Sequence, residues 1–185
     1  MSQADFDKWE PRYASGRGYG SAPDAWITTV GAQFLPDEGT ALDLAGGSGR
    51  HARWLAKRGL DTTLLDISPS GLALAKRLAA EEGLTLHTIQ RDLDQGLPDG
   101  TWDVVVVSFF LVRPFIGELH RLLNPGGVLI LVHPTQTNLE AHDKPGGRWL
   151  FEDGELTAVP GLQTVHHEEG WGNGGRHEVR FVGRR

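Results

Sequence analysis

The stretch TALDLAGGSGRHA, residues 40–52, predicts a strand, a glycine loop and the start of a helix in direct succession. Its first, apolar half is typical of a buried parallel strand. The next residues, Gly46, Gly47 and Gly49, allow a ligand to approach the backbone closely because no Cβ stands in the way. A helix expected over 50–58 turns its N-terminal N–H groups towards the same place. We therefore expect a nucleotide-type cofactor site at this turn.

The choice of cofactor depends on two acidic residues, because the glycines also satisfy a dinucleotide fingerprint, Gly47-x-Gly49-x-x-Ala52. Asp43 lies at the end of the first strand, where a carboxylate repels a pyrophosphate but attracts an ammonium group. S-adenosylmethionine carries an ammonium, a carboxylate and a sulfonium group, and no phosphate. Asp66 ends the next apolar run, 19 residues after Gly47, where a carboxylate can accept hydrogen bonds from both ribose hydroxyls. Together these residues favour S-adenosylmethionine.

The pattern Asp43-x-Ala45-x-Gly47-x-Gly49 resembles the first motif of the class I S-adenosylmethionine-dependent methyltransferases, acid-x-Gly-x-Gly-x-Gly, with Ala45 in place of the first glycine. The stretch LLNPGG at 122–127, followed by an apolar run, is similar to the segment after a helix in the same family. The resemblance covers roughly residues 34–182. It is closest to small bacterial methyltransferases of the tellurite-resistance type, through the stretches DKWEPRY at 7–13 and SFFLVRP at 108–114 and a short acidic tail segment.

The resemblance implies an α/β fold with a Rossmann-like, doubly wound, seven-stranded sheet of order 3-2-1-4-5-7-6. Most strands are expected to be parallel, and an antiparallel C-terminal hairpin strand closes the sheet. We expect a single domain over 1–185, with a core over 37–185. A helical cap over 1–36 either closes over the site as a lid or simply covers the sheet.

The expected elements follow the apolar runs and the glycine and proline positions along the chain. Strands are expected at 41–45, 62–66, 84–90, 102–110, 128–133, 162–169 and 177–182. Helices are expected at 4–13 (interrupted by Pro11), 23–34, 50–58, 69–82 and 114–123. The segment 135–153 is expected to form a loop or short helix over the site. Tyr19 falls in a glycine-rich link between the first two helices, and Asn173 in the turn between the last two strands.

The resemblance places the cofactor contacts at the ends of the first four strands and in the turns that follow them. These residues are Asp43, Ala45, Gly46, Gly47, Gly49, Asp66, Ile67, Asp92, Leu93, Ser108 and Phe109. Among them, the amino-acid end is assigned to Asp43, Gly47 and Gly49, the ribose to Asp66, the adenine to Asp92 with Leu93, and the wall near the methyl group to Ser108 and Phe109. Asp92 has a second interpretation, since aspartate often only caps a turn.

Methyl transfer from a sulfonium is a direct in-line displacement, so positioning and the exclusion of water supply most of the acceleration. A general base matters only when the acceptor must lose a proton. The candidate catalytic residues are Arg113, to hold an anionic acceptor, and His133, to act as the base. The alternatives are that Arg113 caps a helix or pairs with a surface acid, and that His133 is structural.

The composition of the chain limits the kinds of partner that we expect it to bind. Its 185 residues carry a net charge of −6, which provides no attraction to nucleic acid or an anionic membrane. The absence of cysteine excludes disulfides and thiolate metal sites. The N-terminal segment is unlike a signal peptide, and no apolar stretch is long enough for a membrane helix. We expect a cytoplasmic monomer or homodimer with a small-molecule acceptor, and no nucleic-acid or membrane partner.

We expect no metal site. His133, His142 and Asp143 could be ligands, but no established metal-binding spacing accompanies them. The adjacent His166 and His167 would point to opposite faces of a strand and could not easily share one ion.

Three other functions stay open. Methylation of a macromolecule is disfavoured by the acidic charge and by the sequence SFFL at 108–111, where amino-group methylases have Asn-Pro-Pro-aromatic. An NAD-dependent oxidoreductase is disfavoured by Asp43 and by the lack of a catalytic domain. A non-catalytic protein that binds S-adenosylmethionine or S-adenosylhomocysteine would carry the same cofactor motif as an enzyme.

Overall fold

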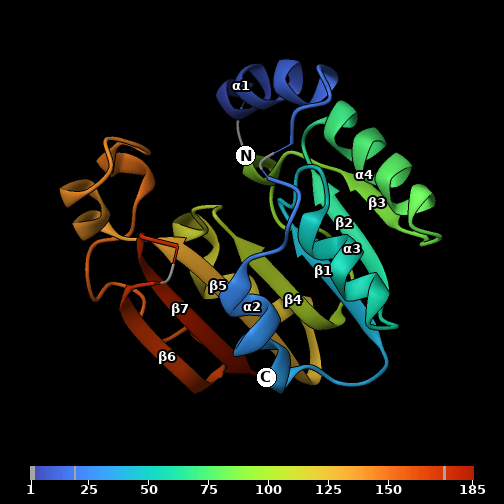
Figure 1. Ribbon diagram of the computed structural model, residues 1–185. Coiled ribbons are helices and arrows are strands. Elements are labelled where there is room, and N and C mark those ends of the chain that lie inside the picture. The colour runs from blue at the N-terminus through green and yellow to red at the C-terminus, as the bar shows by residue number, and fades with distance from the viewer. Residues whose placement is uncertain (1–2, 19, 173) are drawn as a thin grey trace.

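The structure, a computed structural model, describes residues 3–18, 20–172 and 174–185. Its centre is a seven-stranded sheet of order β3-β2-β1-β4-β5-β7-β6, which confirms the predicted order (Figure 1). The strands are β1 (Thr40–Leu44), β2 (Asp61–Asp66), β3 (His87–Gln90), β4 (Trp102–Ser108), β5 (Leu123–Pro134), β6 (Gln163–Trp171) and β7 (His177–Arg184). Tyr19 and Asn173, placed above in the glycine link and the hairpin turn, lie outside the described residues.

The pairing of the strands locates the place where a ligand is expected. The neighbouring strands among β1 to β5 pair in parallel, and β7 is antiparallel to both β5 and β6. The strand order reverses between β1 and β4, whose register sets Leu42 beside Val105. In open α/β sheets, ligands bind beyond the carboxyl ends of the strands at such a reversal. The residues that directly follow β1 and β4 therefore face the expected site.

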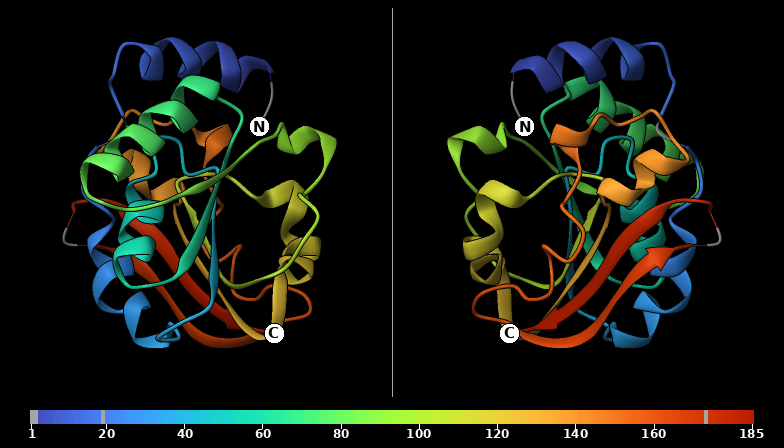
Figure 2. Two further views of the ribbon diagram at one scale, coloured as in Figure 1. Left: turned by 90° about the vertical axis from the view of Figure 1, so that its right-hand side faces the viewer. Right: turned by 90° about the vertical axis from the view of Figure 1, so that its left-hand side faces the viewer.

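Both faces of the sheet are covered, which explains why its central strands are apolar throughout. Val104 and Val106 belong to the core on one face, and Val105 and Val107 to the core on the other. The helices α2 (Ala25–Thr29), α3 (Arg50–Lys57) and α4 (Pro69–Glu81) lie on one side of the sheet, and the 3-10 segment η3 (Arg113–Leu122) lies on the other (Figure 2).

Three predicted helices differ from the observed ones. The segment 23–34 forms α2 and then a separate 3-10 turn, η1 (Gly31–Phe34), because glycine at 31 disfavours a continuous helix. The segment predicted at 114–123 is 3-10 (η3) instead of α-helical. Its proline lies in the first turn, where an α-helix tolerates it, so the difference follows from the fit of a short connection between the paired strands β4 and β5. The first helix, α1 (Gln3–Ala14), continues through Pro11, where an interruption was expected.

The remaining elements are short. The 3-10 turns η4 (Gln136–Glu140) and η5 (Gly147–Trp149) lie in the segment expected to be a loop or short helix, and η2 (Leu93–Gln95) follows β3. Within the described ranges, no helix combines the length and the apolar character that crossing a bilayer requires.

Candidate cofactor-binding site

The glycine loop after β1 is fastened to the end of β2 through Asp66. The Gly47 N–H donates to Asp66 Oδ2 at 2.8 Å, and the Ser68 N–H donates to Asp66 Oδ1 at 2.9 Å. Burial raises the pKa of Asp66, although these backbone donors act in the opposite direction. Each carboxylate oxygen thus accepts one of these hydrogen bonds and keeps capacity for another. The structure therefore brings together the loop and the acid that the sequence assigned to one ligand.

The three glycines of the loop have different surroundings. A Cβ on Gly46 would overlap Asp43 and come within 2.5 Å of Leu64 Cδ1, and one on Gly49 would lie 2.8 Å from the Ala75 Cβ. Both residues are therefore glycine because the loop packs tightly on the protein interior. A Cβ on Gly47, whose φ is +59°, would instead overlap the tip of the Tyr13 side chain on α1. Sequence reasoning could not distinguish these roles, since each glycine fits the same motif.

Asp43 is completely buried beneath the loop. Its Oδ2 accepts a hydrogen bond from the Ala52 N–H at 2.9 Å, while Oδ1 has no partner within the described part of the chain. Burial raises the pKa of Asp43 to about 7, against the effects of the Ala52 N–H and the Arg50 charge. A buried carboxylate with an unpaired oxygen is costly, and a nearby cation would reduce that cost.

The residues that follow β1 and β4 are held in strained conformations. Ala45 has φ +58° and Phe109 has φ +57°, in the left-handed region that residues other than glycine rarely adopt. These are the positive-φ non-glycine residues in the described ranges, and both lie at the reversal of strand order. Strained backbone of this kind concentrates at functional sites. Ser108, just before Phe109, accepts a hydrogen bond from Arg50 at 3.3 Å, which ties the β4 end to the start of α3.

Helix α1 packs on α4 and covers the loop (Figure 1). The Glu10 carboxylate accepts hydrogen bonds from the Ser68 hydroxyl, from the Ser70 hydroxyl and from the Ser70 N–H, at the start of α4. Although burial opposes it, these hydrogen bonds lower the pKa of Glu10. Tyr13 is buried against Gly47, and burial together with the Asp66 charge raises the pKa of its hydroxyl. Sequence analysis singled out neither Glu10 nor Tyr13 as a site residue, because their contacts are entirely tertiary.

A cleft of about 500 Å³ opens between α1 and the ends of β2 and β3. Its lining includes Phe6 from α1, Ile67 after β2 and Asp92 after β3. Asp92 caps η2 by accepting the Asp94 N–H at 2.9 Å, which is its second interpretation, while its contact with the adenine stays a prediction. The side chain of Leu93 is fully buried in the core, which leaves only its backbone for the expected adenine contact.

Comparison with known proteins agrees with this geometry. Residues 41–127 match the family model of a methyltransferase domain. Residues 41–127 therefore form a methyltransferase domain. A demethylmenaquinone methyltransferase from Thermus thermophilus is 38% identical over 100 residues, which cover 49% of this chain and 45% of that protein. The uncharacterized methyltransferase YbaJ from Bacillus subtilis is 35% identical over 138 residues, which cover 70% and 50% respectively. The chain thus spans about half the length of these relatives.

Solved structures share the fold of this methyltransferase domain. TehB from Haemophilus influenzae has a TM-score of 0.75 at 21% identity, covering 95% of this chain and 67% of that one. A SAM dependent methyltransferase from Aquifex aeolicus has a TM-score of 0.66 at 17% identity, covering 100% and 98%. At such identities the likeness concerns the fold alone, and it confirms the predicted fold class.

The two candidate catalytic residues of the methyltransferase domain lie together, around Phe151. Arg113 holds Glu155 through two hydrogen bonds, from Nε at 2.5 Å and from Nη2 at 2.6 Å. His133 is buried, its Nε2 bonds the Trp149 carbonyl at 2.8 Å, and its ring meets Phe151 edge-on. Burial lowers the pKa of His133 to about 4, so the ring is neutral at physiological pH. The alternative for Arg113 was that it pairs with an acidic residue, and Glu155 is such a partner. The catalytic role of Arg113 stays a prediction.

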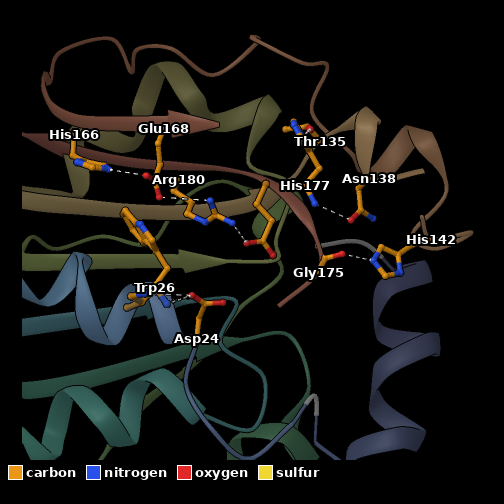
Figure 3. Close-up of polar contacts among 12 residues, drawn as sticks. Asp24, Trp26, Thr135, Asn138, His142, His166, Glu168, Gly175, His177 and Arg180 are labelled. Carbon is orange, nitrogen blue, oxygen red and sulfur yellow. Dashed lines mark hydrogen bonds and ion pairs between the residues drawn. The ribbon is translucent and has the colours of Figure 1, made fainter. Parts of the chain in front are cut away.

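A second polar cluster lies near β6 and β7, where Figure 3 shows His177 in contact with Thr135 and Asn138. Side-chain atoms of Asp153, Glu169 and His177 lie within 4.8 Å of one another, a set that sequence analysis missed because the residues are far apart in the chain. His177 Nδ1 lies 2.6 Å from the Thr135 hydroxyl, and Glu169 accepts the Gly154 N–H. Through these contacts, the three residues join the segment between β5 and β6 to the β6–β7 hairpin by hydrogen bonds.

Proposed function

We propose that the chain transfers a methyl group from S-adenosylmethionine to a small-molecule acceptor. The observation that carries this proposal is the hydrogen bond from the Gly47 N–H to Asp66 at 2.8 Å, which sets an acid with spare acceptor capacity beside a glycine loop. The loop lies where the strand order reverses, the usual ligand site of such sheets. The name of the Thermus relative, a demethylmenaquinone methyltransferase, supports a small acceptor.

The residues present fit the proposed cofactor. Asp66 can accept one further hydrogen bond on each oxygen, as two ribose hydroxyls require. The unpaired Oδ1 of Asp43 and its raised pKa suit a neighbouring ammonium group. The cleft beside Ile67 and Asp92 has room for a purine ring. Ala45, Gly46 and Gly49 act by shaping the loop.

When bound, S-adenosylmethionine supplies a methyl group on a positively charged sulfur, which leaves as a neutral thioether when the acceptor's lone pair bonds the methyl carbon. The role of the protein is to hold the acceptor and the methyl group in line and to exclude water from them. We assign the wall beside the reacting atoms to Ser108 and Phe109. Helix α1, held over the loop by Glu10 and Tyr13, serves as a lid.

Proton removal limits the choice of acceptor. His133 is a weak base at neutral pH, because burial lowers its pKa to about 4. Arg113 already binds Glu155 with its planar edge, so it can hold an acceptor only after that ion pair opens. We therefore propose acceptors that react as anions, such as thiolates or oxyanions, for which no base is required.

Methyl transfer distinguishes an enzyme from a non-catalytic binding protein, the other function that fits this loop. The protein is incubated with S-adenosylmethionine carrying a tritium-labelled methyl group and a panel of thiols and metalloid oxyanions. An enzyme forms S-adenosylhomocysteine and labelled acceptor in equal amounts, and only when the acceptor is present. Cofactor binding without product from any acceptor would favour the binding protein.

The lid is tested by Glu10→Gln, which removes the negative charge that α1 presents to the start of α4. Hydrogen bonds to a charged group contribute about 1.5–3 kcal/mol, so we expect S-adenosylhomocysteine to dissociate roughly tenfold faster or more. Stopped-flow tryptophan fluorescence measures this rate, with Trp9 on α1 as a reporter. The control is Asp7→Asn, also on α1, where Asp7 accepts a hydrogen bond only from the neighbouring Gln3 among the described residues. If S-adenosylhomocysteine dissociated from the two variants at equal rates, Glu10 would have no role in holding the lid.

A further inference from the structure

The segment that follows β5 meets the β6–β7 hairpin at three residues whose side chains end close together. Asp153 lies between β5 and β6, Glu169 lies near the end of β6, and His177 is the first residue of β7. One oxygen of each carboxylate and one ring nitrogen of His177 lie within 4.8 Å of one another. Ligand atoms around a tetrahedral Zn²⁺ are about 3.4 Å apart, so small side-chain rotations would close this set around an ion.

Asp153 and Glu169 bring two negative charges together without a basic partner. Across the described ranges, no lysine or arginine forms an ion pair with either carboxylate. The neighbouring Glu168, by contrast, has a guanidinium nitrogen of Arg180 at 3.5 Å. Two carboxylates at this separation repel each other. A cation bound between Asp153 and Glu169 would replace this repulsion with attraction.

Both carboxylates are held in place and still have room for a cation. Asp153 accepts hydrogen bonds from the Thr137 N–H, at 3.2 Å, and from the Thr137 hydroxyl. The two oxygens of Glu169 share the Gly154 N–H, at 3.0 and 3.1 Å. An ionised carboxylate has about four acceptor positions, so lone pairs are left over on each residue. These hydrogen bonds therefore orient the carboxylates without using up their capacity to bind an ion.

The imidazole of His177 is held in the way that is usual for a metal ligand. Its Nδ1 lies 2.6 Å from the hydroxyl of Thr135, which is completely buried, and its backbone N–H donates to Asn138 Oδ1 at 3.3 Å (Figure 3). Metal-binding histidines commonly donate one ring N–H to an oxygen and bind the ion with the other nitrogen. His142, considered above as a ligand, instead bonds the Gly175 carbonyl at 2.6 Å.

We propose that Asp153, Glu169 and His177 bind one divalent transition-metal ion of the Zn²⁺ class. The nitrogen ligand favours Zn²⁺ over Mg²⁺ and Ca²⁺, which take oxygen ligands. Asp153 is exposed, so the ion can enter from solvent. The bound ion would tie the segment between β5 and β6 to the hairpin at the carboxyl edge of the sheet. This inference does not depend on the proposed methyl transfer.

The test is a calorimetric titration of the full chain, freed of metals by dialysis against a chelator, with zinc, magnesium and calcium chlorides. We expect one Zn²⁺ per chain, bound at least tenfold more tightly than Mg²⁺ or Ca²⁺. Long-range ¹H–¹⁵N correlation spectra of the histidine rings identify the nitrogen ligand. Zn²⁺ should shift the resonances of one imidazole, and the signals of that imidazole should be missing from the spectrum of His177→Ala.

Conservative variants assign the binding to the two carboxylates. Asp153→Asn and Glu169→Gln keep an oxygen that accepts the existing hydrogen bonds but lose the charge, and each should bind Zn²⁺ at least tenfold more weakly. Thr135→Val, which removes the hydroxyl beside the imidazole, should cost roughly tenfold. The matched control is His87→Ala, because His87 lies 3.0 Å from Asp61 in an exposed histidine–carboxylate pair outside this set. The control should bind Zn²⁺ as the wild type does.

Thermal unfolding gives a second readout. Zn²⁺ should raise the unfolding midpoint of the wild type, because an ion that binds only the folded state stabilises it, and should leave that of Glu169→Gln nearly unchanged. The proposal would be overturned by the absence of Zn²⁺ binding, by Mg²⁺ binding as tightly, or by undiminished Zn²⁺ affinity in Asp153→Asn and Glu169→Gln. A loss of affinity in His87→Ala would also overturn it. The two carboxylate variants test the site separately, so either result stands if the other variant does not fold.

Discussion

Gly46→Ala is expected to destabilise the protein by about 3 kcal/mol or more, the upper range for overpacking a rigid interior. The new methyl group would overlap the Asp43 carboxylate and come within 2.5 Å of Leu64 Cδ1. Neither neighbour can move easily, because Asp43 and Leu64 are fully buried on adjacent paired strands. Thermal unfolding should show a midpoint lowered by about 10 °C, since 1 kcal/mol corresponds to roughly 2–4 °C at this chain length.

The control for this substitution is Gly117→Ala in η3. A Cβ at Gly117 meets no described atom within 4 Å, and its φ is not positive. Alanine there should leave the midpoint unchanged or raise it slightly, because it restricts the unfolded chain. If Gly46→Ala were as harmless as Gly117→Ala, the loop would not pack against Asp43 as described.

Asp43→Asn is expected to stabilise the ligand-free protein at pH 8 and to weaken cofactor binding. Burial raises the pKa of Asp43 to about 7 from an ordinary value of 3.8, so the folded state resists ionisation that the unfolded state accepts. Folding is therefore increasingly disfavoured as the pH rises from about 4 to about 7, and the penalty is constant above that range. Asparagine carries no charge and escapes this penalty.

The difference in unfolding free energy between Asp43→Asn and wild type should thus grow from near zero at pH 4 to on the order of a few kcal/mol at pH 8. Urea unfolding at several pH values measures it. His51 and His133, whose pKa values burial lowers to about 3 and about 4, destabilise both proteins at acidic pH and cancel in the comparison. A difference independent of pH would mean that Asp43 is not the buried charge described here.

The affinity of Asp43→Asn for the cofactor product tests whether Asp43 binds the ligand. If Asp43 faces the ammonium group, Asp43→Asn should bind S-adenosylhomocysteine at least tenfold more weakly, the scale for a hydrogen bond between charged groups. Greater stability together with weaker binding would show that the acid is retained for the ligand. Unchanged affinity would assign Asp43 to loop packing alone.

The sheet could be predicted from the sequence because its signals are local. The valine run of β4 is apolar on both faces, and the cap of α4 was also foreseeable, with Ser68 accepting the Gly71 N–H and Pro69 in the first turn. Non-local effects were not accessible. The 3-10 form of η3 depends on how a short connection fits between two paired strands, and helix propensity does not contain that information.

In the candidate site, too, some features could be predicted from local sequence and others depend on tertiary contacts. Asp43, Asp66 and the glycines were found through their spacing, but the direction in which each glycine faces needed the packed structure. The contacts of Glu10 with the start of α4 join residues about sixty positions apart, and nothing in the sequence connects them. Arg113 and His133 were nominated by position after strands, while their occupied partners, Glu155 and the Trp149 carbonyl, come from a loop that periodicity does not describe.

The most direct test of the central claim is a calorimetric titration of the purified protein with S-adenosylmethionine, S-adenosylhomocysteine and NAD in parallel. The fastening of the glycine loop to Asp66, with a buried acid beneath it, predicts micromolar binding of both adenosyl ligands and none of NAD. Binding of NAD without either adenosyl ligand would contradict the account of Asp43 and the function built on it.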